Sequence, residues 1–255
     1  MSELIKVCDV EKYYGEGNNI TKAVNRVSFT IEKREFVGIM GASGSGKSTL
    51  LNMLATIDRV TAGHIYYDGV DITALKLEQV AEFRKNNLGF VFQDFNLLDT
   101  LTLEENIRLA MTLHGRKKQE IDPVVSGMMN KLGISEIADK FPYQVSGGQK
   151  QRCACARALV NQPKLVLADE PTGALDSRSS MMLLDTFTLM NREFHATILM
   201  VTHDAFSASY CGRILFLKDG QIFHELVRGD KTRREFLNQI LDVLALTGGD
   251  SNYVG

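Results

Sequence analysis

Short runs of mostly apolar residues recur along the chain, separated by longer stretches of helical or polar character. Runs of this kind, bounded by polar or glycine residues, predict buried strands at 36–40, 88–92, 165–168 and 197–201. The segment 47–57 predicts a helix, because its apolar residues recur at the helical spacing of three and four. Strands that alternate with helices favour a largely parallel sheet that is covered by helices.

The first 70 residues show a different pattern. Strands are expected at 4–10, 24–31 and 64–67, where residues with high strand propensity alternate or cluster. The last of these strands runs into an Asp68-Gly69 turn. This opening part of the chain is therefore expected to be more antiparallel than the remainder.

Helical patterns dominate the middle and the end of the chain. Residues 103–160 are expected to be mostly helical. Breaks are expected near Gly115, Pro123, Gly133 and Pro142. A final helix should begin at the capping box formed by Thr232 and Glu235 and should run to about Ala245.

Composition and charge limit the classes of protein that fit. The 255 residues are 44% hydrophobic and 24% charged, which is close to the norm for soluble globular proteins. A net charge of −2 gives no basic field that would attract nucleic acid. The apolar runs are far shorter than the roughly 18 residues that a membrane-spanning helix needs. Four scattered cysteines do not make a disulfide scaffold, and they favour a reducing, cytoplasmic setting.

A phosphate-binding loop is the strongest chemical signal in the sequence. The segment GASGSGKST matches the pattern GxxxxGK followed by Ser, between a predicted strand and a predicted helix. Its glycines let backbone N–H groups surround a phosphate, and the helix directs its N-terminal dipole at the same anion. Lys47 would contact the β- and γ-phosphates of ATP, and Ser48 would ligate Mg²⁺. The expected ATP-binding residues of the loop are Gly41, Ala42, Ser43, Gly44, Ser45, Gly46, Lys47, Ser48 and Thr49.

Two carboxylates follow the predicted strand 165–168. Asp169 and Glu170 would lie at the C-terminal edge of the sheet, where folds of this kind bind ligands. Asp169 fits the residue that holds Mg²⁺, and Glu170 is placed to act as the general base toward the attacking water. An isolated Asp-Glu pair would favour a solvated strand end, but the phosphate loop in the same chain favours ATP hydrolysis.

A third motif, the four residues Ser146-Gly-Gly-Gln149, precedes the helical segment 150–159 and places the Ser146 hydroxyl at the N-terminus of that helix. A match of four residues is weak when it stands alone. Its position before Asp169 and Glu170, in a chain with a phosphate loop, resembles the signature motif of the ATP-binding subunits of ABC transporters. Val145 precedes it where Leu is usual, and the resemblance covers nearly the full chain. The implied ATP-binding residues of the motif are Ser146, Gly147, Gly148 and Gln149.

The resemblance implies roles for further residues. Tyr14 would stack on adenine, although the adjacent Tyr13 leaves this choice open between two rings. Gln93 would sense the γ-phosphate and the metal, His203 would be the switch histidine, and Asp176 would lie in the D-loop at the dimer contact. The implied catalytic residues are Lys47, Gln93, Glu170 and His203. The implied Mg²⁺ ligands are Ser48, Gln93 and Asp169.

The resemblance also implies the fold. It is an α/β fold: a P-loop NTPase (RecA-like) core of mainly parallel sheet, with an N-terminal antiparallel β subdomain and a helical signature subdomain. One ABC ATP-binding domain would fill residues 1–255. The core with the β subdomain would take about 1–92 and 161–227, and the helical subdomain about 93–160. A C-terminal helix and tail would take about 228–255.

Three longer segments, 83–106, 168–177 and 200–221, resemble a narrower group. This group contains the Bce-type ATPases of bacitracin and antimicrobial-peptide resistance, within the wider group of macrolide-export and lipoprotein-release ATPases. The resemblance implies a homodimer of ATPase subunits bound to a large membrane permease at the cytoplasmic face of a bacterial cell membrane. It further implies a sensor histidine kinase that is reached through the permease, and no direct contact with nucleic acid.

Other functions stay open on the sequence alone. An ATPase on a similar permease could serve mechanical signalling, or could handle lipoproteins or macrolides. A soluble ABC ATPase that acts on nucleic acid or ribosomes is less favoured, because such chains usually carry two nucleotide modules or a long coiled coil. This chain has one phosphate loop, one signature motif and no long heptad region.

The segment after Gln93 carries large apolar residues in a stretch with loop character. These residues are Phe95, Leu97, Leu98, Leu101 and Leu103. They could belong to the core, and for Leu101 and Leu103 the two readings are equally favoured. They could instead line a groove that takes the apolar face of an amphipathic permease helix. Gln93 would then link this groove to the γ-phosphate.

Overall fold

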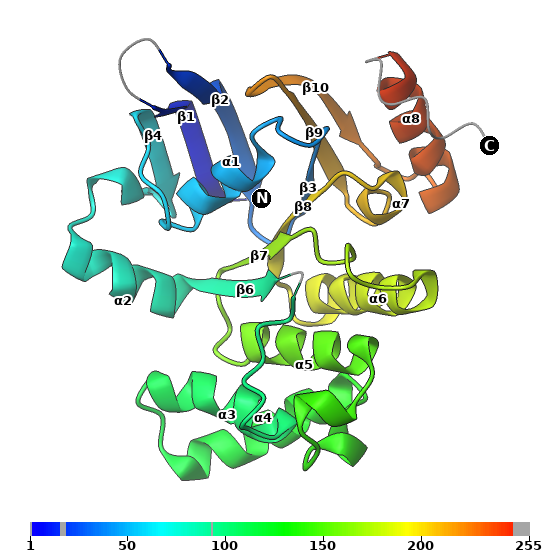
Figure 1. Cartoon of the computed structure of the whole chain (residues 1–255). Helices are drawn as coiled ribbons and strands as arrows, with labels where there is room; N and C mark the ends of the chain where they lie inside the picture. Colours follow the sequence, from blue (N-terminus) through cyan, green and yellow to red (C-terminus); the bar gives the residue numbers. More distant parts are fainter. Residues whose placement is uncertain (1, 16–18, 93, 247–255) are drawn as a thin grey trace. The chain divides into compact units, whose positions relative to one another are not determined.

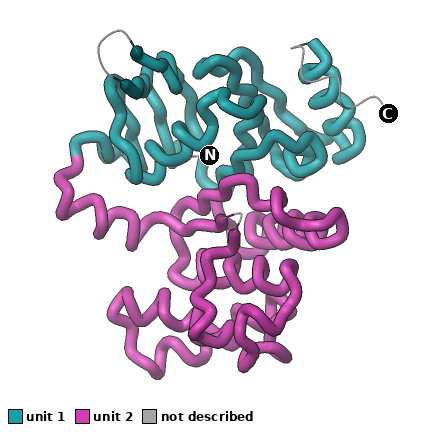
Figure 2. Tube along the Cα trace, in the orientation of Figure 1, with its two compact units in different colours: residues 1–74, 199–255 teal, residues 75–198 magenta. Residues whose placement is uncertain are grey.

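The computed structural model describes residues 2–15, 19–92 and 94–246. The chain divides into two compact units, which Figure 2 shows in different colours. Unit 1 contains the residues up to Ala74 and those from Leu199 onward, and unit 2 contains the residues from Leu75 to Ile198. The boundary falls inside the buried strand β8 (Thr197–Thr202). Every helix in the described ranges is too short or too polar to span a bilayer.

Unit 1 contains an antiparallel sheet with the strand order β2-β1-β4-β5 (Figure 1). Its strands are β1 (Glu3–Tyr14), β2 (Thr21–Glu32), β4 (Ala62–Tyr67) and β5 (Val70–Asp71). All neighbouring pairs are antiparallel, which confirms the expectation for the opening part of the chain. The register between β1 and β2 shifts between Val7 and Val10, and this bulge keeps both residues buried despite their odd spacing.

A second group of strands in unit 1 is built around a parallel pair. β3 (Phe36–Met40) pairs in parallel with β9 (Arg213–Lys218), and β10 (Gln221–Val227) pairs antiparallel with β9. Every residue of β3 is buried, which is typical of a parallel strand covered on both faces. The sequence did not predict β10, because most of its residues are exposed and give no apolar run.

The helices of unit 1 are α1 (Lys47–Leu54), the 3-10 turn η1 (Ile72–Ala74), the short α7 (Ala205–Ala208) and α8 (Arg233–Leu246). Helix α1 ends earlier than expected, because Thr56 adopts a left-handed φ of 55° and the next residue, Ile57, is exposed. Helix α8 follows the expected capping box. The Glu235 N–H donates to Thr232 Oγ1 at 3.3 Å, and the Thr232 N–H donates to the Glu235 carboxylate at 2.8 Å.

Unit 2 contains the second parallel pair of strands and most of the helices. Strand β6 (Leu88–Phe92) pairs in parallel with β7 (Leu165–Asp169), which with the β3–β9 pair confirms the expected parallel character of the core. The helices are α2 (Leu77–Asn87), α3 (Leu103–Leu113), α4 (Lys118–Lys131), η2 (Ser135–Ile137), η3 (Pro142–Gln144), α5 (Gly147–Leu159) and α6 (Ser177–Glu193). Helix α5 packs against β6, α3 and α6.

One local expectation for unit 2 was wrong, and one of its helices was not predicted. The expected break at Pro123 does not occur, because Pro123 lies on the exposed face of α4. Burial of Ile121 and Val125 on the other face holds the helix across the missing hydrogen bond. Helix α2 gave no sequence signal, because none of its residues is buried.

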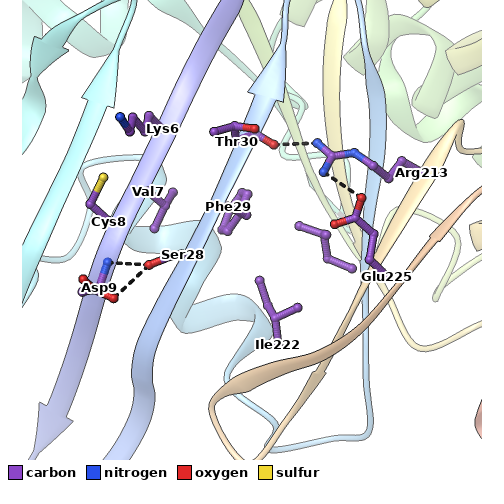
Figure 3. Close-up of a pocket in the computed structure, with 11 residues that line it drawn as sticks. Lys6, Val7, Cys8, Asp9, Ser28, Phe29, Thr30, Arg213, Ile222 and Glu225 are labelled. Carbon is purple, nitrogen blue, oxygen red and sulfur yellow. Dashed lines mark hydrogen bonds and ion pairs between the residues drawn. The ribbon is translucent and has the colours of Figure 1, made fainter.

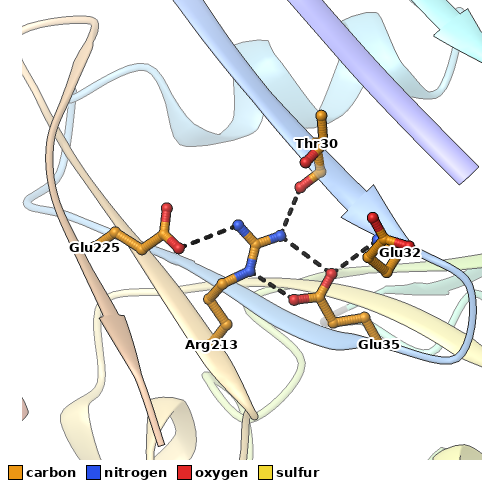
Figure 4. A network of polar contacts seen from close by, with 5 residues as sticks. All are labelled: Thr30, Glu32, Glu35, Arg213 and Glu225. Atoms are coloured by element: carbon orange, nitrogen blue, oxygen red, sulfur yellow. Dashed lines mark hydrogen bonds and ion pairs between the residues drawn. The ribbon is translucent and has the colours of Figure 1, made fainter. Parts of the chain in front are cut away.

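A network around Arg213 ties together the two groups of strands in unit 1 (Figure 4). The guanidinium of Arg213 on β9 binds both carboxylate oxygens of Glu35, at 2.6 and 3.1 Å. It also donates to the carbonyl oxygen of Thr30 on β2 at 2.5 Å, and to Glu225 on β10 at 3.4 Å. Glu35 in turn accepts from the N–H of Glu32 at 2.8 Å. Arg213 and Glu35 are both largely buried. Their two parallel hydrogen bonds make a bidentate pair, which is the strongest arrangement of arginine with a carboxylate.

We expect Arg213→Met to lower the free energy of unfolding by about 2–3 kcal/mol, because it leaves the largely buried Glu35 carboxylate without its charged partner. The matched control is Arg26→Met, whose side chain is 77% exposed in its pair with Glu11. That control should cost less than about 1 kcal/mol. Denaturant unfolding followed by circular dichroism measures both. Equal losses in the two variants would contradict a structural role for the Arg213 network.

Candidate nucleotide-binding site

The phosphate loop occupies the turn between β3 and α1 in unit 1. Gly46, which is the N-cap of α1, has a φ of 102°, and a Cβ there would lie 2.2 Å from the carbonyl oxygen of Ala23. A Cβ on Gly41 would lie 2.2 Å from the carbonyl oxygen of Leu217. The path of the backbone therefore excludes a side chain at both positions, and the glycines of the motif are a packing requirement as well as a chemical one.

The interior of the loop suits an anion. Lys47 is only 7% exposed, and its Nζ donates to the carbonyl oxygens of Gly41 and Ala42 at 2.9 Å each. Gly46 provides no side chain to cap α1, and the first turn of α1 has no acidic residue. The Ser45 hydroxyl is buried and has no hydrogen-bond partner among the described residues. A buried cation, a helix N-terminus and an unsatisfied hydroxyl together fit a phosphate group.

Tyr14, the last residue of β1, is held beside the helix of the phosphate loop. Its hydroxyl donates to Asp58, which follows α1, at 2.5 Å. The Lys12 ammonium lies 4.9 Å from the centroid of the Tyr14 ring and 2.5 Å from the Asp58 carboxylate. Burial and the hydrogen bond to Asp58 raise the pKa of Tyr14, against an opposing hydrogen bond with Thr49. The side chain is 42% exposed, which leaves ring surface open to a base.

Tyr13 makes different contacts. Its hydroxyl donates to Glu11, two residues earlier on β1, and the Lys22 ammonium of β2 lies 5.0 Å from its ring centroid. Both partners belong to the antiparallel sheet, whereas the partners of Tyr14 include residues of α1 and of the turn after it. Proximity to the phosphate loop therefore favours Tyr14 as the ring that stacks on adenine.

Asp169 and Glu170 lie at the end of β7 in unit 2. Strands β6 and β7 pair with Phe92 opposite Asp169, so the two strands end at the same edge. Glu170 has a φ of 43°, in the left-handed region that residues with side chains rarely adopt. Its carbonyl oxygen accepts from the Gly173 N–H at 3.0 Å, which closes a turn behind it. Gln93, which follows β6, lies outside the described residues.

The signature motif forms the start of α5. Ser146 is the N-cap, and its Oγ accepts from the Gln149 N–H at 3.3 Å. In return, the Ser146 N–H donates to the side-chain oxygen of Gln149 at 2.8 Å. This reciprocal capping box fixes the Ser146 hydroxyl at a helix N-terminus. Its contact with a nucleotide stays a prediction.

Asp176 and His203 are placed at the starts of two other helices. The Asp176 carboxylate caps α6 by accepting from the N–H groups of Arg178 and Ser179, both at 2.9 Å. Hydrogen bonds of this kind hold the pKa of Asp176 below its ordinary value. His203 follows β8 and is exposed, and the next residue, Asp204, caps α7.

The expected site residues are distributed over both units. Unit 1 contains Tyr14, residues 41–49 and His203. Unit 2 contains residues 146–149, Asp169, Glu170 and Asp176.

Sequence reasoning missed three residues: Lys12 and Asp58, which contact Tyr14, and Gln151, which contacts the carbonyls of Phe92 and Pro171. Asp58 lies 44 residues from Tyr14 and 46 from Lys12 in the sequence, so no local pattern reveals its contacts with them. Gln151 did leave a signal, because it is the one polar residue on a stripe of α5 that is otherwise small or apolar. The other members of this buried stripe are Ala154, Cys155 and Ala158.

The apolar loop after residue 93 has a mixed environment. Leu103, the first residue of α3, is fully buried, so it belongs to the core and not to an exposed groove. Leu98 is 47% exposed. The side chain of Asn106 on α3 holds the loop at Leu98. It accepts from the Leu98 N–H at 2.8 Å and donates to the Leu98 carbonyl at 3.1 Å. Phe95, Leu97 and Leu101 are half-buried.

Unit 1 contains a hollow of about 550 Å³, and none of the residues that line it belongs to the phosphate loop (Figure 3). Residues of β1, β2, β9 and β10 line it. Several of its polar groups already bind one another: Arg213 binds Glu225, and Ser28 binds both the N–H and the carboxylate of Asp9. The hollow therefore offers a ligand little unsatisfied polarity.

The loop between β3 and α1 defines a nucleotide-binding protein of the phosphate-loop class. Within that class, residues 24–173 match the family model described as ABC transporter. The chain is 48% identical to "ABC transporter ATP-binding protein YxdL" of Bacillus subtilis (strain 168), over 99% of this chain and 97% of the relative. It is 45% identical to "Bacitracin export ATP-binding protein BceA" of Halalkalibacterium halodurans, over 98% of each.

A solved structure extends the similarity to the fold. The dimeric, post-hydrolysis structure of the ATP-binding cassette MJ0796 of Methanocaldococcus jannaschii, bound to ADP and Pi, matches with a TM-score of 0.78. The sequence identity is 37%, and the match covers 88% of this chain and 98% of that one. The chain therefore belongs to the ABC transporter family and is an ATP-binding ATPase subunit of it. The resemblance to the Bce-type ATPases is confirmed.

We expect Tyr14→Ala to weaken ATP binding about tenfold or more, since stacking on an aromatic ring is worth about 1–3 kcal/mol per base. Tyr13→Ala is the matched control and should change the affinity less than about twofold. Titration of the isolated subunit with a fluorescent ATP analogue measures both. If Tyr13→Ala shows the larger loss, the other ring stacks on the base.

Proposed function

We propose that this chain dimerises around two ATP molecules and that their hydrolysis drives conformational change in a partner membrane permease. The observation that carries the proposal is the phosphate loop, where the buried Lys47, the uncapped start of α1 and the unsatisfied Ser45 hydroxyl meet. These groups lie within one turn of each other and suit a chain of phosphates better than any other common ligand.

Several of the expected site residues would take part in hydrolysis. Lys47 would neutralise charge on the β- and γ-phosphates, and Glu170 would accept a proton from the attacking water. His203 would help to hold the γ-phosphate. Ser48, Gln93 and Asp169 would hold Mg²⁺, which is consistent with its preference for oxygen ligands and supplies charge neutralisation at the phosphates when bound.

A dimer follows from the number of motifs. The phosphate loop and the signature motif each occur once in the sequence, and they would recognise opposite sides of one nucleotide. Two copies related by a twofold axis would form two shared sites, in which Ser146 of one copy faces the γ-phosphate held by Lys47 of the other. The dimeric structure of MJ0796 with ADP and Pi supports this arrangement.

The membrane partner is proposed from the relatives and from the loop after residue 93. The exposed Leu98 and the half-buried Phe95, which follow Gln93 closely in the sequence, offer apolar surface where an amphipathic permease helix could bind. The 45% identity to a bacitracin export ATPase supports a role in resistance to antimicrobial peptides. The subunit would then act at the cytoplasmic face of the cell membrane and would reach a sensor histidine kinase through the permease.

The proposal predicts that Glu170→Gln traps a dimer. The substitution keeps the shape of the side chain and removes the base, so ATP should bind and persist. Sedimentation velocity should show a monomer without nucleotide and a dimer at saturating ATP and Mg²⁺. Glu136→Gln, an exposed residue of η2, is the matched control and should not form a lasting dimer. A Glu170→Gln variant that stays monomeric at saturating ATP, even with the permease present, would refute the shared-site arrangement.

A further inference from the structure

Gln151 is a fully buried polar residue on a helix face that is otherwise small and apolar. It lies on α5, and its side chain is 0% exposed. Burying an amide is unfavourable unless its polar atoms find partners, so an apolar residue of similar length would suit this position better on packing grounds alone. The contacts that the amide makes therefore identify what it contributes.

The side-chain amide lies between two backbone carbonyls from different segments of unit 2. Nε2 of Gln151 is 3.4 Å from the carbonyl oxygen of Phe92 and 3.3 Å from that of Pro171. Both acceptors are carbonyls, so the NH₂ group must be the end that faces them. Phe92 is the last residue of β6, directly before Gln93, and Pro171 directly follows Glu170.

The backbone at Glu170 needs such support. A φ of 43° is unfavourable for a residue with a side chain, and it persists only where the surroundings fix it. The Gly173 N–H holds the carbonyl oxygen of Glu170 at 3.0 Å, and the Gln151 amide holds that of the next residue, Pro171. These two donors therefore restrain the backbone at Glu170 and at the residue that follows it.

The two ends of the Gln151 amide differ in their contacts. Oε1 of Gln151 is buried and has no hydrogen-bond partner among the described residues. Among the described residues, the NH₂ end of the amide is therefore the end whose contacts account for a polar side chain at this position.

We propose that Gln151 is a positioning residue that couples the signature motif to the hydrolytic glutamate of the same copy. Ser146, at the N-terminus of α5, is five residues before Gln151 on the same helix, a rise of about 7.5 Å along a rigid element. In a head-to-tail dimer, Ser146 serves the nucleotide of one site, and Glu170 serves the other. A shift of α5 as the signature engages nucleotide therefore moves the amide that holds Phe92 and Pro171, and the two sites report to each other. This inference rests on the proposed function.

Gln151→Met tests the inference, because it keeps the length of the side chain and removes the donor. We expect kcat for ATP hydrolysis by the subunit in complex with its permease to fall at least tenfold, about 1.4 kcal/mol. The affinity for ATP should stay within about twofold, because the described hydrogen-bond partners of Gln151 are the carbonyls of Phe92 and Pro171 and not residues of the phosphate loop. Cys155→Ala, one turn later on the same buried stripe, is the matched packing control and should keep kcat within about twofold.

A double-mutant cycle separates positioning from a general packing effect. If Gln151 acts through Glu170, then Gln151→Met should change the residual hydrolysis of the Glu170→Gln variant by less than about twofold. A further tenfold loss in that background, or an equal loss of kcat in Cys155→Ala, would overturn the proposal. If Gln151→Met does not fold, Gln151→Asn gives the same cycle with a donor that is one methylene shorter. Absence of ATPase activity in the unmodified complex would instead refute the proposed function itself.

Discussion

The rest of the molecule depends on one electrostatic requirement: a polyphosphate has to be bound by positive charge that is fixed before it arrives. In the proposed function, backbone N–H groups at the start of α1 would supply part of that charge, and the Lys47 ammonium, held by the carbonyls of Gly41 and Ala42, would supply a further part. The loop can take this course because Gly46 has a left-handed backbone with no room for a Cβ. The fully buried strand β3 anchors one end of the loop, and the buried face of α1 anchors the other.

Unit 2 places the proposed hydrolytic carboxylate, Glu170, on a backbone with a left-handed φ of 43°. Parallel pairing of β6 with β7 brings the ends of both strands to one edge, and the turn closed by Gly173 follows at once. Helix α5 lies against β6, and it carries the signature motif at its start and Gln151 in its second turn. Within unit 2, helix α5 thus joins the signature motif to the carbonyls of Phe92 and Pro171, which adjoin Gln93 and Glu170 in the sequence.

Apolar runs and glycine spacing predicted the buried strands β3, β6, β7 and β8 and the phosphate loop, because those features depend on local sequence. The buried strand β9 was not predicted. Helix α2 and strand β10 escaped prediction, since neither buries enough apolar surface to leave a periodic pattern. The predicted helix break at Pro123 was wrong, because burial of one face of α4 outweighs the single hydrogen bond that proline removes. The contacts of Asp58 with Tyr14 and of Gln151 with Phe92 join segments 44 and 59 residues apart, and only the fold brings such residues together.

The most direct test of the account is the steady-state ATPase activity of Lys47→Ala in the complex with the permease. Lys131→Ala, which removes an ammonium that lies over the Phe194 ring, is the matched control for loss of a lysine. The account predicts that Lys47→Ala loses well over nine-tenths of the activity, more than about 1.4 kcal/mol of transition-state stabilisation, while the control stays near the unmodified rate. Retention of more than about a tenth of the activity by Lys47→Ala would contradict the claim that the phosphate loop is the centre of hydrolysis.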